Sequence, residues 1–309
     1  MTLLSDQADA VRALVESADP GAVWAVGGPD GPQACSDGAD QVFDVGGLTA
    51  VLALWPAVGT LVDEGALRLH TPLAAYGAEA ASGTPAGTTA HHLLTRPGGT
   101  AALTRLVEHL AGSTLAEVAA ARVWNPLGMT RTRLADGTLR APLADLALFL
   151  RHLLRPSAPT APRPGGAAGA ASVDSAASAA RAPSAPSAPS ALSAARAGSV
   201  PGAANETNDP DHASGPQPLT RAWTAESLRI RTGELTPARG LLWHPAPHGV
   251  WTHHAPTDPG PAVWISPRHH RWAVLLPAAA GPLRTTFREA VFAPHGPAPS
   301  STSGGVPRA

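Results

Sequence analysis

Strand-like segments lie at both ends of this chain, and the sequence between them is helical. Residues 21–28 (GAVWAVGG) are typical of a buried strand that ends in glycines, and a second strand is predicted over 33–38, after a GPDG turn. Four more strands are predicted near the C-terminus, over 239–245, 249–255, 261–267 and 271–278. Because the backbone N–H and C=O groups of a strand need partners on neighbouring strands, we expect one sheet assembled from both chain ends. The fold class is therefore α+β.

The predicted helices follow the 3.6-residue spacing of apolar side chains. They cover residues 8–17, 47–64, 88–95, 101–112, 114–124, 142–154, 224–233 and 283–293. Pro56 is expected to break or kink the second of these helices. Trp243, Trp251, Trp264 and Trp272 each fall within a predicted strand, and we interpret them as core packing of the sheet rather than as ligand-stacking residues.

A segment rich in Ala, Pro, Ser and Gly, residues 156–218, separates the helical middle from the C-terminal strands. It has almost no large apolar side chains, so it cannot bury enough surface to offset its ordering entropy, and we predict a disordered linker. Because strands of one sheet lie on both sides of it, we interpret the linker as an insertion within one domain. The predicted organisation is N-terminal strands and a helical subdomain over 1–155, the linker over 156–218, C-terminal strands and a closing helix over 219–294, and a disordered tail over 295–309.

The absence of lysine excludes several chemistries. All 22 residues in the Lys+Arg total are arginine, which rules out a Walker A loop, a Schiff-base lysine and a lysine acting as general base. The formal net charge of -1 provides no basic field for nucleic acid and no polybasic membrane patch. A small-molecule ligand or a protein partner is the remaining expectation. Cys35 is the only cysteine, so an internal disulfide and a cysteine-based zinc site are excluded.

The first twenty residues do not have the apolar core of a signal peptide, because Asp6, Asp9, Glu16 and Asp19 interrupt it. The longest apolar run, residues 45–62, is short for a membrane span and contains glycines and a proline. We therefore expect a cytoplasmic protein with no membrane partner.

The order of these segments resembles the β-lactamase-related serine hydrolases, which include class C β-lactamases, D-alanyl-D-alanine carboxypeptidases and related esterases. The matching stretches are PGAVWAVGGPDG, FDVGGLTAVLALWPAVGTLVDEGALRLHTPLAAY, HLLTRPGG, LAGSTLAEVAAARVWNPLGMTRTRL, APLADLALFLRHLL and THHAPTDPGPAVWISPRHHRWAVLLPA. NPLGMTRT and LVDEGALRLHTPL are the most specific, and both are scaffold features. The resemblance implies an α+β (α/β sandwich) fold of the β-lactamase/transpeptidase type, with an antiparallel sheet, flanking helices and a helical subdomain.

The family's catalytic motifs have no full counterpart in this sequence. Its Ser-x-x-Lys motif places a nucleophile and a base on the same helix face, and FDVGGLTAV puts Gly47 and Ala50 at those positions. Shifting the register by one residue gives Gly46 and Thr49, and Thr49 has no base that would activate it. The family's Tyr-x-Asn segment is missing after HLLTRPGG, and the only tyrosine, Tyr76, matches a scaffold position.

The family's third motif, Lys-Thr-Gly or His-Thr-Gly, best matches His253, His254 and Ala255. The glycine of that motif lets a substrate lie close to the strand, and the methyl group of Ala255 obstructs this approach. Losing nucleophile and base costs such enzymes on the order of a million-fold in rate. We expect a non-catalytic binding or regulatory homologue with no catalytic residue, no cofactor and no metal. Its degenerate pocket would comprise Gly47, Ala50, His253, His254 and Ala255, and the Gly47 N–H would remain able to bind a carbonyl or carboxylate oxygen.

Two alternatives stay open. The chain could be an esterase, amidase or β-lactam hydrolase that uses an unrecognised serine and histidine, although it has no G-x-S-x-G elbow. It could also be a decayed gene product without function. The histidine pairs at 91–92, 253–254 and 269–270 invite a metal hypothesis, but adjacent side chains diverge on a helix or strand, so no pair forms a ligand set alone.

Overall fold

The computed structural model describes residues 5–155, 218–233, 237–255 and 259–293. All of these residues belong to one compact unit. The predicted linker, apart from its last residue, and the predicted C-terminal tail lie outside the described residues.

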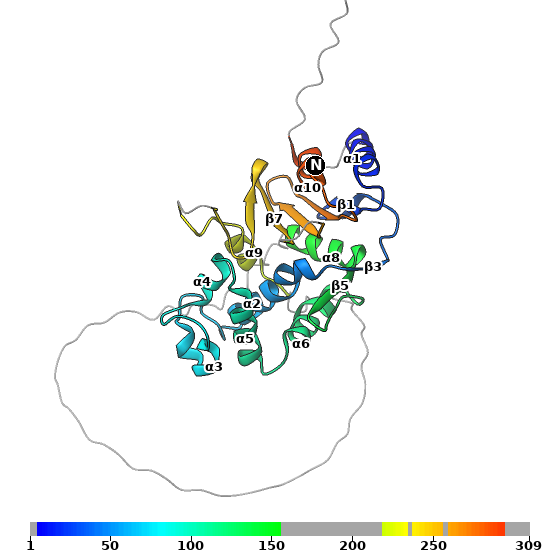
Figure 1. Ribbon diagram of the computed structural model, residues 1–309. Coiled ribbons are helices and arrows are strands. Elements are labelled where there is room, and N and C mark those ends of the chain that lie inside the picture. The colour runs from blue at the N-terminus through cyan, green and yellow to red at the C-terminus, as the bar shows by residue number, and fades with distance from the viewer. Residues whose placement is uncertain (1–4, 156–217, 234–236, 256–258, 294–309) are drawn as a thin grey trace, which may run out of the picture. The chain divides into compact units, whose positions relative to one another are not determined.

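Six antiparallel strands form the main sheet, in the order β2-β1-β9-β8-β7-β6. The strands are β1 (Val23–Gly28), β2 (Gly31–Cys35), β6 (His244–Ala246), β7 (Val250–His254), β8 (Ala262–Ser266) and β9 (Arg271–Leu276). Strand β1 pairs with β9, with Val26 opposite Ala273, so strands from opposite ends of the chain lie side by side (Figure 1). The sheet built from both chain ends is therefore confirmed.

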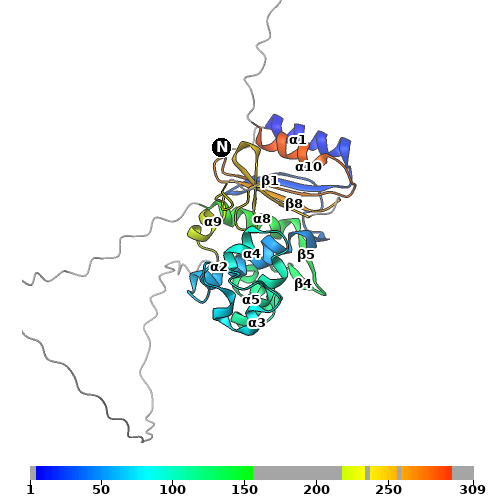
Figure 2. The same ribbon diagram turned by 60° about the vertical axis from the view of Figure 1, so that its left-hand side comes forward.

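Helices cover both faces of this sheet (Figure 2). The covering helices are α1 (Ser5–Ala18), α8 (Leu143–Leu154) and α10 (Leu283–Phe292). Helices α1 and α10 lie together on one face, where Phe287 packs with its ring centroid 6.1 Å from that of Trp24 and 5.6 Å from that of Trp264. Helix α8 lies on the other face. This layered α+β arrangement agrees with the fold class predicted from the sequence.

Most of the remaining helices form a block on the α8 side of the sheet (Figure 2). They are α2 (Trp55–Asp63), α3 (Ala78–Ala81), α4 (Ala90–Thr95), α5 (Thr100–Ala111), α6 (Leu115–Ala119), α7 (Asn125–Leu127) and, after the linker, α9 (Arg221–Ser227). A second sheet that the sequence did not predict, in the order β3-β5-β4, borders this block. Its strands are β3 (Val42–Asp44), β4 (Arg133–Ala135) and β5 (Thr138–Pro142).

Several predicted elements have shifted boundaries, among them the strand expected over 33–38, which is β2, and two elements after the linker differ most. The strand expected over 239–245 is β6, which begins only at His244. Residues 240–243 before it form a turn, because Gly240 N donates to Trp243 O and Leu242 has a positive φ of 63°. Trp243 precedes the strand but is fully buried, so its predicted core role is confirmed. The helix expected over 224–233 is α9, which begins earlier because the side chain of Thr220 caps its N-terminus.

The helix expected over 47–64 is irregular. A 3-10 turn at Gly46–Leu48 and a π-helical turn at Ala50–Leu54 precede the regular helix α2. Pro56 has no N–H to donate to the Leu52 carbonyl four residues earlier, and Trp124 Nε1 donates to that carbonyl instead, at 2.8 Å. The disturbance predicted near Pro56 thus takes the form of a π turn just before it.

Candidate functional site

Gly47 lies in the 3-10 turn Gly46–Leu48, where the chain passes from β3 into the helical block. The turn is held by Gly46 N, which donates to Asp44 Oδ1 at 2.9 Å. Gly47 itself is half-buried. The turn therefore places Gly47 beside the end of β7, the strand that carries the third predicted motif.

Ala255 follows β7 and packs directly on Gly47. A Cβ atom placed on Gly47 would lie 2.3 Å from Cβ and 3.0 Å from Cα of Ala255, whereas carbon atoms in contact are about 3.5–4.0 Å apart. The Ala255 backbone is fixed, because its N donates to Pro261 O at 3.0 Å and its carbonyl accepts from Arg284 Nη1 at 3.3 Å. Ala255 is also only 3% exposed. Position 47 therefore has no room for a side chain unless this strand end moves.

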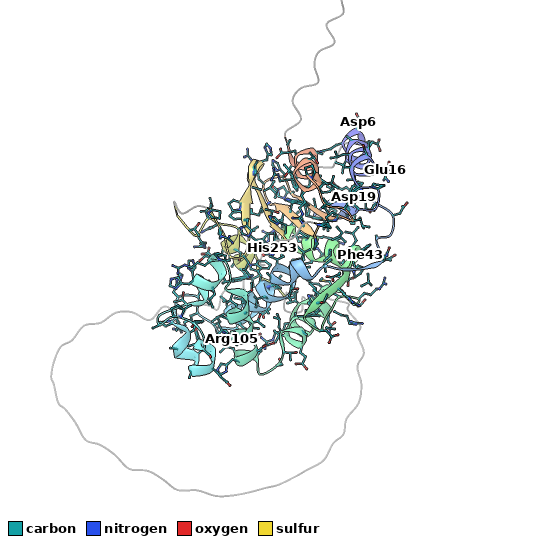
Figure 3. The ribbon with its side chains drawn as sticks, in the orientation of Figure 1. Asp6, Glu16, Asp19, Phe43, Arg105 and His253 are labelled. Atoms are coloured by element: carbon teal, nitrogen blue, oxygen red, sulfur yellow. The ribbon has the colours of Figure 1, made fainter. Side chains whose placement is uncertain are left out.

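His253, which is labelled in Figure 3, lies on β7 and faces the loop that precedes β6. Its Nδ1 lies 2.8 Å from Leu242 O, so this nitrogen carries the ring's N–H and donates to that carbonyl. Burial lowers the pKa of His253 to about 4, although the hydrogen bond to Leu242 acts in the opposite direction. The ring is therefore neutral at pH 7, and its single N–H is engaged by the Leu242 carbonyl, which favours a structural role over that of a general base.

Other basic groups surround His253. The His244 ring stacks on it with centroids 6.1 Å apart, and lies 6.4 Å from the ring of the exposed His254. Burial lowers the pKa of His244 to about 4, and the charge of Arg239 lowers it further. His254 Nδ1 lies 2.9 Å from Ala255 O. Because the His244 and His253 rings are both neutral at pH 7, the positive charge that acts on them is that of Arg239, and it favours an anionic ligand over a cation.

The other positions considered in the sequence contribute no reactive group. Ala50 is half-buried in the π turn and has no polar side-chain atom. Thr49 Oγ1 donates to Gly46 O at 2.8 Å, so its hydroxyl is engaged by its own turn. Tyr76 Oη accepts from Arg68 N at 2.8 Å and holds a loop, as expected of a scaffold residue.

The connection between α4 and α5 is short. Residues 96–99 alone join these two helices, at the place where the family resemblance leads one to look for Tyr-x-Asn. The turn is tight, since a Cβ atom on Gly99 would lie 2.3 Å from Leu93 O. No intervening segment is present between α4 and α5, all of whose residues are described.

The other histidine pairs have structural partners. His92 and Thr89 form a reciprocal capping box at the start of α4. Ser266 Oγ lies 3.0 Å from His269 Nδ1, but Ser266 is fully buried and donates to Gly249 O at 3.1 Å, so this pair cannot reach a substrate. Among the residues that the structure describes, no group of three or more His, Cys, Asp or Glu side chains is arranged to hold a metal ion. Within the same ranges no helix has both the length and the apolar character needed to cross a membrane.

Two residues that shape the site were missed in the sequence. Leu242 supplies the carbonyl that meets the His253 ring, and Arg284 holds the segment after β7 through its bonds to Ala255 O and Gly260 O. Leu242 belongs to an apolar run and Arg284 to a helix near the C-terminus, so neither has a local pattern that points to the site. Only their positions in space connect them to Gly47.

Comparison of the sequence with models of known protein families, and with curated proteins, finds no match. Solved structures do match. A class C β-lactamase from Rhodobacter sphaeroides is 13% identical, with 93% of this chain and 98% of that chain covered, at a TM-score of 0.59. A β-lactamase from Mycobacterium bovis is 18% identical, with 91% and 99% covered, at a TM-score of 0.56.

A D-alanine carboxypeptidase from Burkholderia cenocepacia is also similar, at 15% identity, with 92% of this chain and 99% of that chain covered and a TM-score of 0.56. At such low identities these likenesses concern the fold alone. They agree with the order of sheet and helices described above. The chain therefore has the β-lactamase/transpeptidase fold of the β-lactamase-related serine hydrolases, as its sequence predicted.

Proposed function

We propose that this chain is a non-catalytic homologue of the β-lactamase-related serine hydrolases, which acts by binding a small molecule or a protein partner. The contact between Gly47 and Ala255 carries the proposal. It occupies the place where a nucleophilic side chain would project, and a neutral His253, whose N–H is engaged by Leu242 O, borders it. The lysine-free sequence supplies no substitute for the missing base.

The two unusual residues of this site fit each other. The family resemblance pairs a serine at position 47 with a glycine at position 255, whereas here the methyl group stands on Ala255 and is absent from Gly47. A serine at position 47 needs the volume that the Ala255 methyl group fills. We therefore interpret the two residues as a repacked contact at the position of a lost nucleophile. Such a matched contact supports a folded protein that has kept a function over the product of a decayed gene.

A ligand of this site would be anionic. His244, His253 and His254 lie together, and the charge of Arg239 acts on the first two. A carboxylate would gain from the positive charge of Arg239, whereas a cation would be repelled by it. Benzylpenicillin and a D-alanyl-D-alanine peptide both carry a carboxylate and are suitable first ligands for a reversible binding assay.

Covalent labelling tests the non-catalytic part of the proposal. The purified protein is incubated with a fluorescent penicillin and, separately, with a fluorophosphonate probe. We expect no labelled band with either, because the site has no nucleophile. Stoichiometric labelling by either probe would refute the proposal. An active relative carrying the Ser-x-x-Lys motif, treated in parallel, shows that the probes work.

Three variants separate a missing nucleophile from a blocked site. Gly47→Ser alone should stay unlabelled and lose stability, because its Cβ meets Ala255. Gly47→Ser/Ala255→Gly restores the room, and the further change Ala50→Lys adds a base on the same helix face. Labelling that arises only in the triple variant would show that the site keeps its shape and lacks only its reactive groups.

The alternative function, an esterase, amidase or β-lactam hydrolase that uses an unrecognised serine and histidine, has a direct test. Turnover of p-nitrophenyl acetate that survives purification to homogeneity and is lost in His253→Ala or Ser266→Ala would favour it. The burial of Ser266 argues against this outcome. A cooperative thermal transition of the wild-type protein distinguishes both functions from a decayed gene product.

A further inference from the structure

A cavity of about 280 Å³ lies between the β1–β2 hairpin and α8. Strand β2 is at the opposite end of the strand order from β6 and β7, so this cavity is separate from the Gly47 site and independent of the function proposed for it. Most of its wall is apolar: Ala25, Ala39, Leu143, Ala144, Ala147 and Leu148.

The cavity exists because small side chains meet there. Ala144, Ala147 and Arg151 lie on one face of α8, since residues three and four apart share a helix face. Ala25 on β1 and Ala39 before β3 face them. Where larger apolar residues would fill the space between helix and sheet, these alanines leave it open.

Two polar groups border this apolar space. Arg151 lines the cavity, and its Nε donates to Pro29 O in the β1–β2 turn at 3.1 Å. Within the described ranges the other N–H donors of that guanidinium form no hydrogen bond or ion pair, so its charge is available to a ligand. Cys35, at the end of β2, also lines the cavity and is an exposed free thiol.

We propose that this cavity binds an aliphatic monocarboxylate of about ten non-hydrogen atoms. A space of 280 Å³ corresponds to roughly nine water molecules at about 30 Å³ each, which sets the size of the ligand. The hydrocarbon chain lies against the alanine and leucine side chains, because burying apolar surface is favourable there. The carboxylate pairs with Arg151, whose planar guanidinium can bind it through two parallel hydrogen bonds.

Cys35 offers a specific reporter for this proposal, because it is the only cysteine in the chain. The rate at which neutral iodoacetamide alkylates Cys35 is measured by intact mass, with and without octanoate. We expect saturating octanoate to slow alkylation at least about five-fold, because the bound chain covers the thiol. Acetate has the charge without the chain, and 1-octanol has the chain without the charge, so both should protect far less.

Two matched variants test the role of the charge. Arg151→Met keeps an extended apolar side chain and should abolish protection by octanoate. Arg12→Met removes a different guanidinium, whose Nη2 donates to the backbone carbonyl of Cys35 at 3.4 Å, and should leave protection unchanged. In Cys35→Ser, octanoate should still raise the thermal midpoint, which shows binding without use of the thiol.

Several outcomes would overturn the proposal. Equal protection by octanoate and 1-octanol would show an apolar pocket without carboxylate recognition, and no protection by octanoate would show no site. Unchanged protection in Arg151→Met would remove the assigned anchor. If that variant does not fold, the comparison of octanoate with 1-octanol on the wild-type protein still decides, because it needs no substitution.

Discussion

The contact between Gly47 and Ala255 leads to a quantitative prediction about stability. In Gly47→Ala the new methyl carbon starts 2.3 Å from the Ala255 methyl carbon, more than 1 Å inside a normal contact of about 3.5 Å. Ala255 cannot easily retreat, because its backbone is bonded to Pro261 and Arg284. Overpacking of this kind costs about 1–3 kcal/mol, and the better helix propensity of alanine offsets at most about 1 kcal/mol. We expect a net loss of about 1–2 kcal/mol.

The reverse substitution should also destabilise the protein when made alone. Ala255→Gly removes a buried methyl group, which costs about 0.8 kcal/mol, and adds backbone freedom to the unfolded chain, which costs about 0.5–1 kcal/mol more. The double variant Gly47→Ala/Ala255→Gly moves the methyl group from one side of the contact to the other. Its stability should return to within about 1 kcal/mol of wild type, which gives a favourable coupling energy of about 2 kcal/mol.

Urea unfolding followed by circular dichroism measures all four proteins of this cycle, and the comparison is valid where the m-values agree. Gly46→Ala is the matched control, since a Cβ atom there meets Asp44 Oδ1 at 3.2 Å and is not near Ala255. Its effect should add to that of Ala255→Gly without coupling. If Gly47→Ala and Ala255→Gly are also additive within about 0.5 kcal/mol, the two residues do not pack as described and our reading of the site fails.

Three further measurements follow from buried polar groups. The pKa of His253 is about 4 in the folded protein and 6.5 in the unfolded chain, so the unfolded chain takes up the proton first as the pH falls. The free energy of unfolding should therefore fall by up to about 3 kcal/mol between pH 7 and pH 4. Urea titrations at the two pH values should show a smaller difference for His253→Gln. Trp124→Phe should cost about 1–3 kcal/mol, because it leaves the Leu52 carbonyl buried without its donor, and a thermal midpoint equal to that of wild type would contradict this. Asp145→Ala should cost a similar amount in urea, since the buried carboxylate accepts from Thr132 Oγ1 at 2.8 Å, whereas Asp145→Asn should retain part of that bond and lose less.

The sequence by itself determined the architecture. Strand patterns at both chain ends, with helices between them, required a sheet joined across the whole chain, and β1 paired with β9 provides it. Apolar spacing placed α1, α5, α8 and α10 within a few residues of their observed bounds, because hydrophobic periodicity is a local property. The sequence also identified which residues meet at the candidate site, since Gly47 and Ala255 are in contact.

Other features depended on neighbours far along the chain. The turn at 240–243 replaced an expected strand, because a positive φ at Leu242 and the bond to Trp243 are decided by packing and not by propensity. The small sheet β3-β5-β4 escaped detection, since strands of three to five residues leave little pattern.

The character of the site was likewise decided in three dimensions. The sequence assigns Gly47 and Ala255 to one pocket, but it does not show that the methyl group of Ala255 leaves no room for a side chain at position 47. Three features of the site follow from contacts between residues distant in sequence. Ala255 closes on Gly47, Arg284 holds Ala255 there, and the His253 ring meets the Leu242 carbonyl. Such contacts form only when the sheet and the helical block pack together. Each depends on atomic positions that are set to within a fraction of an ångström, and no local sequence pattern encodes these positions.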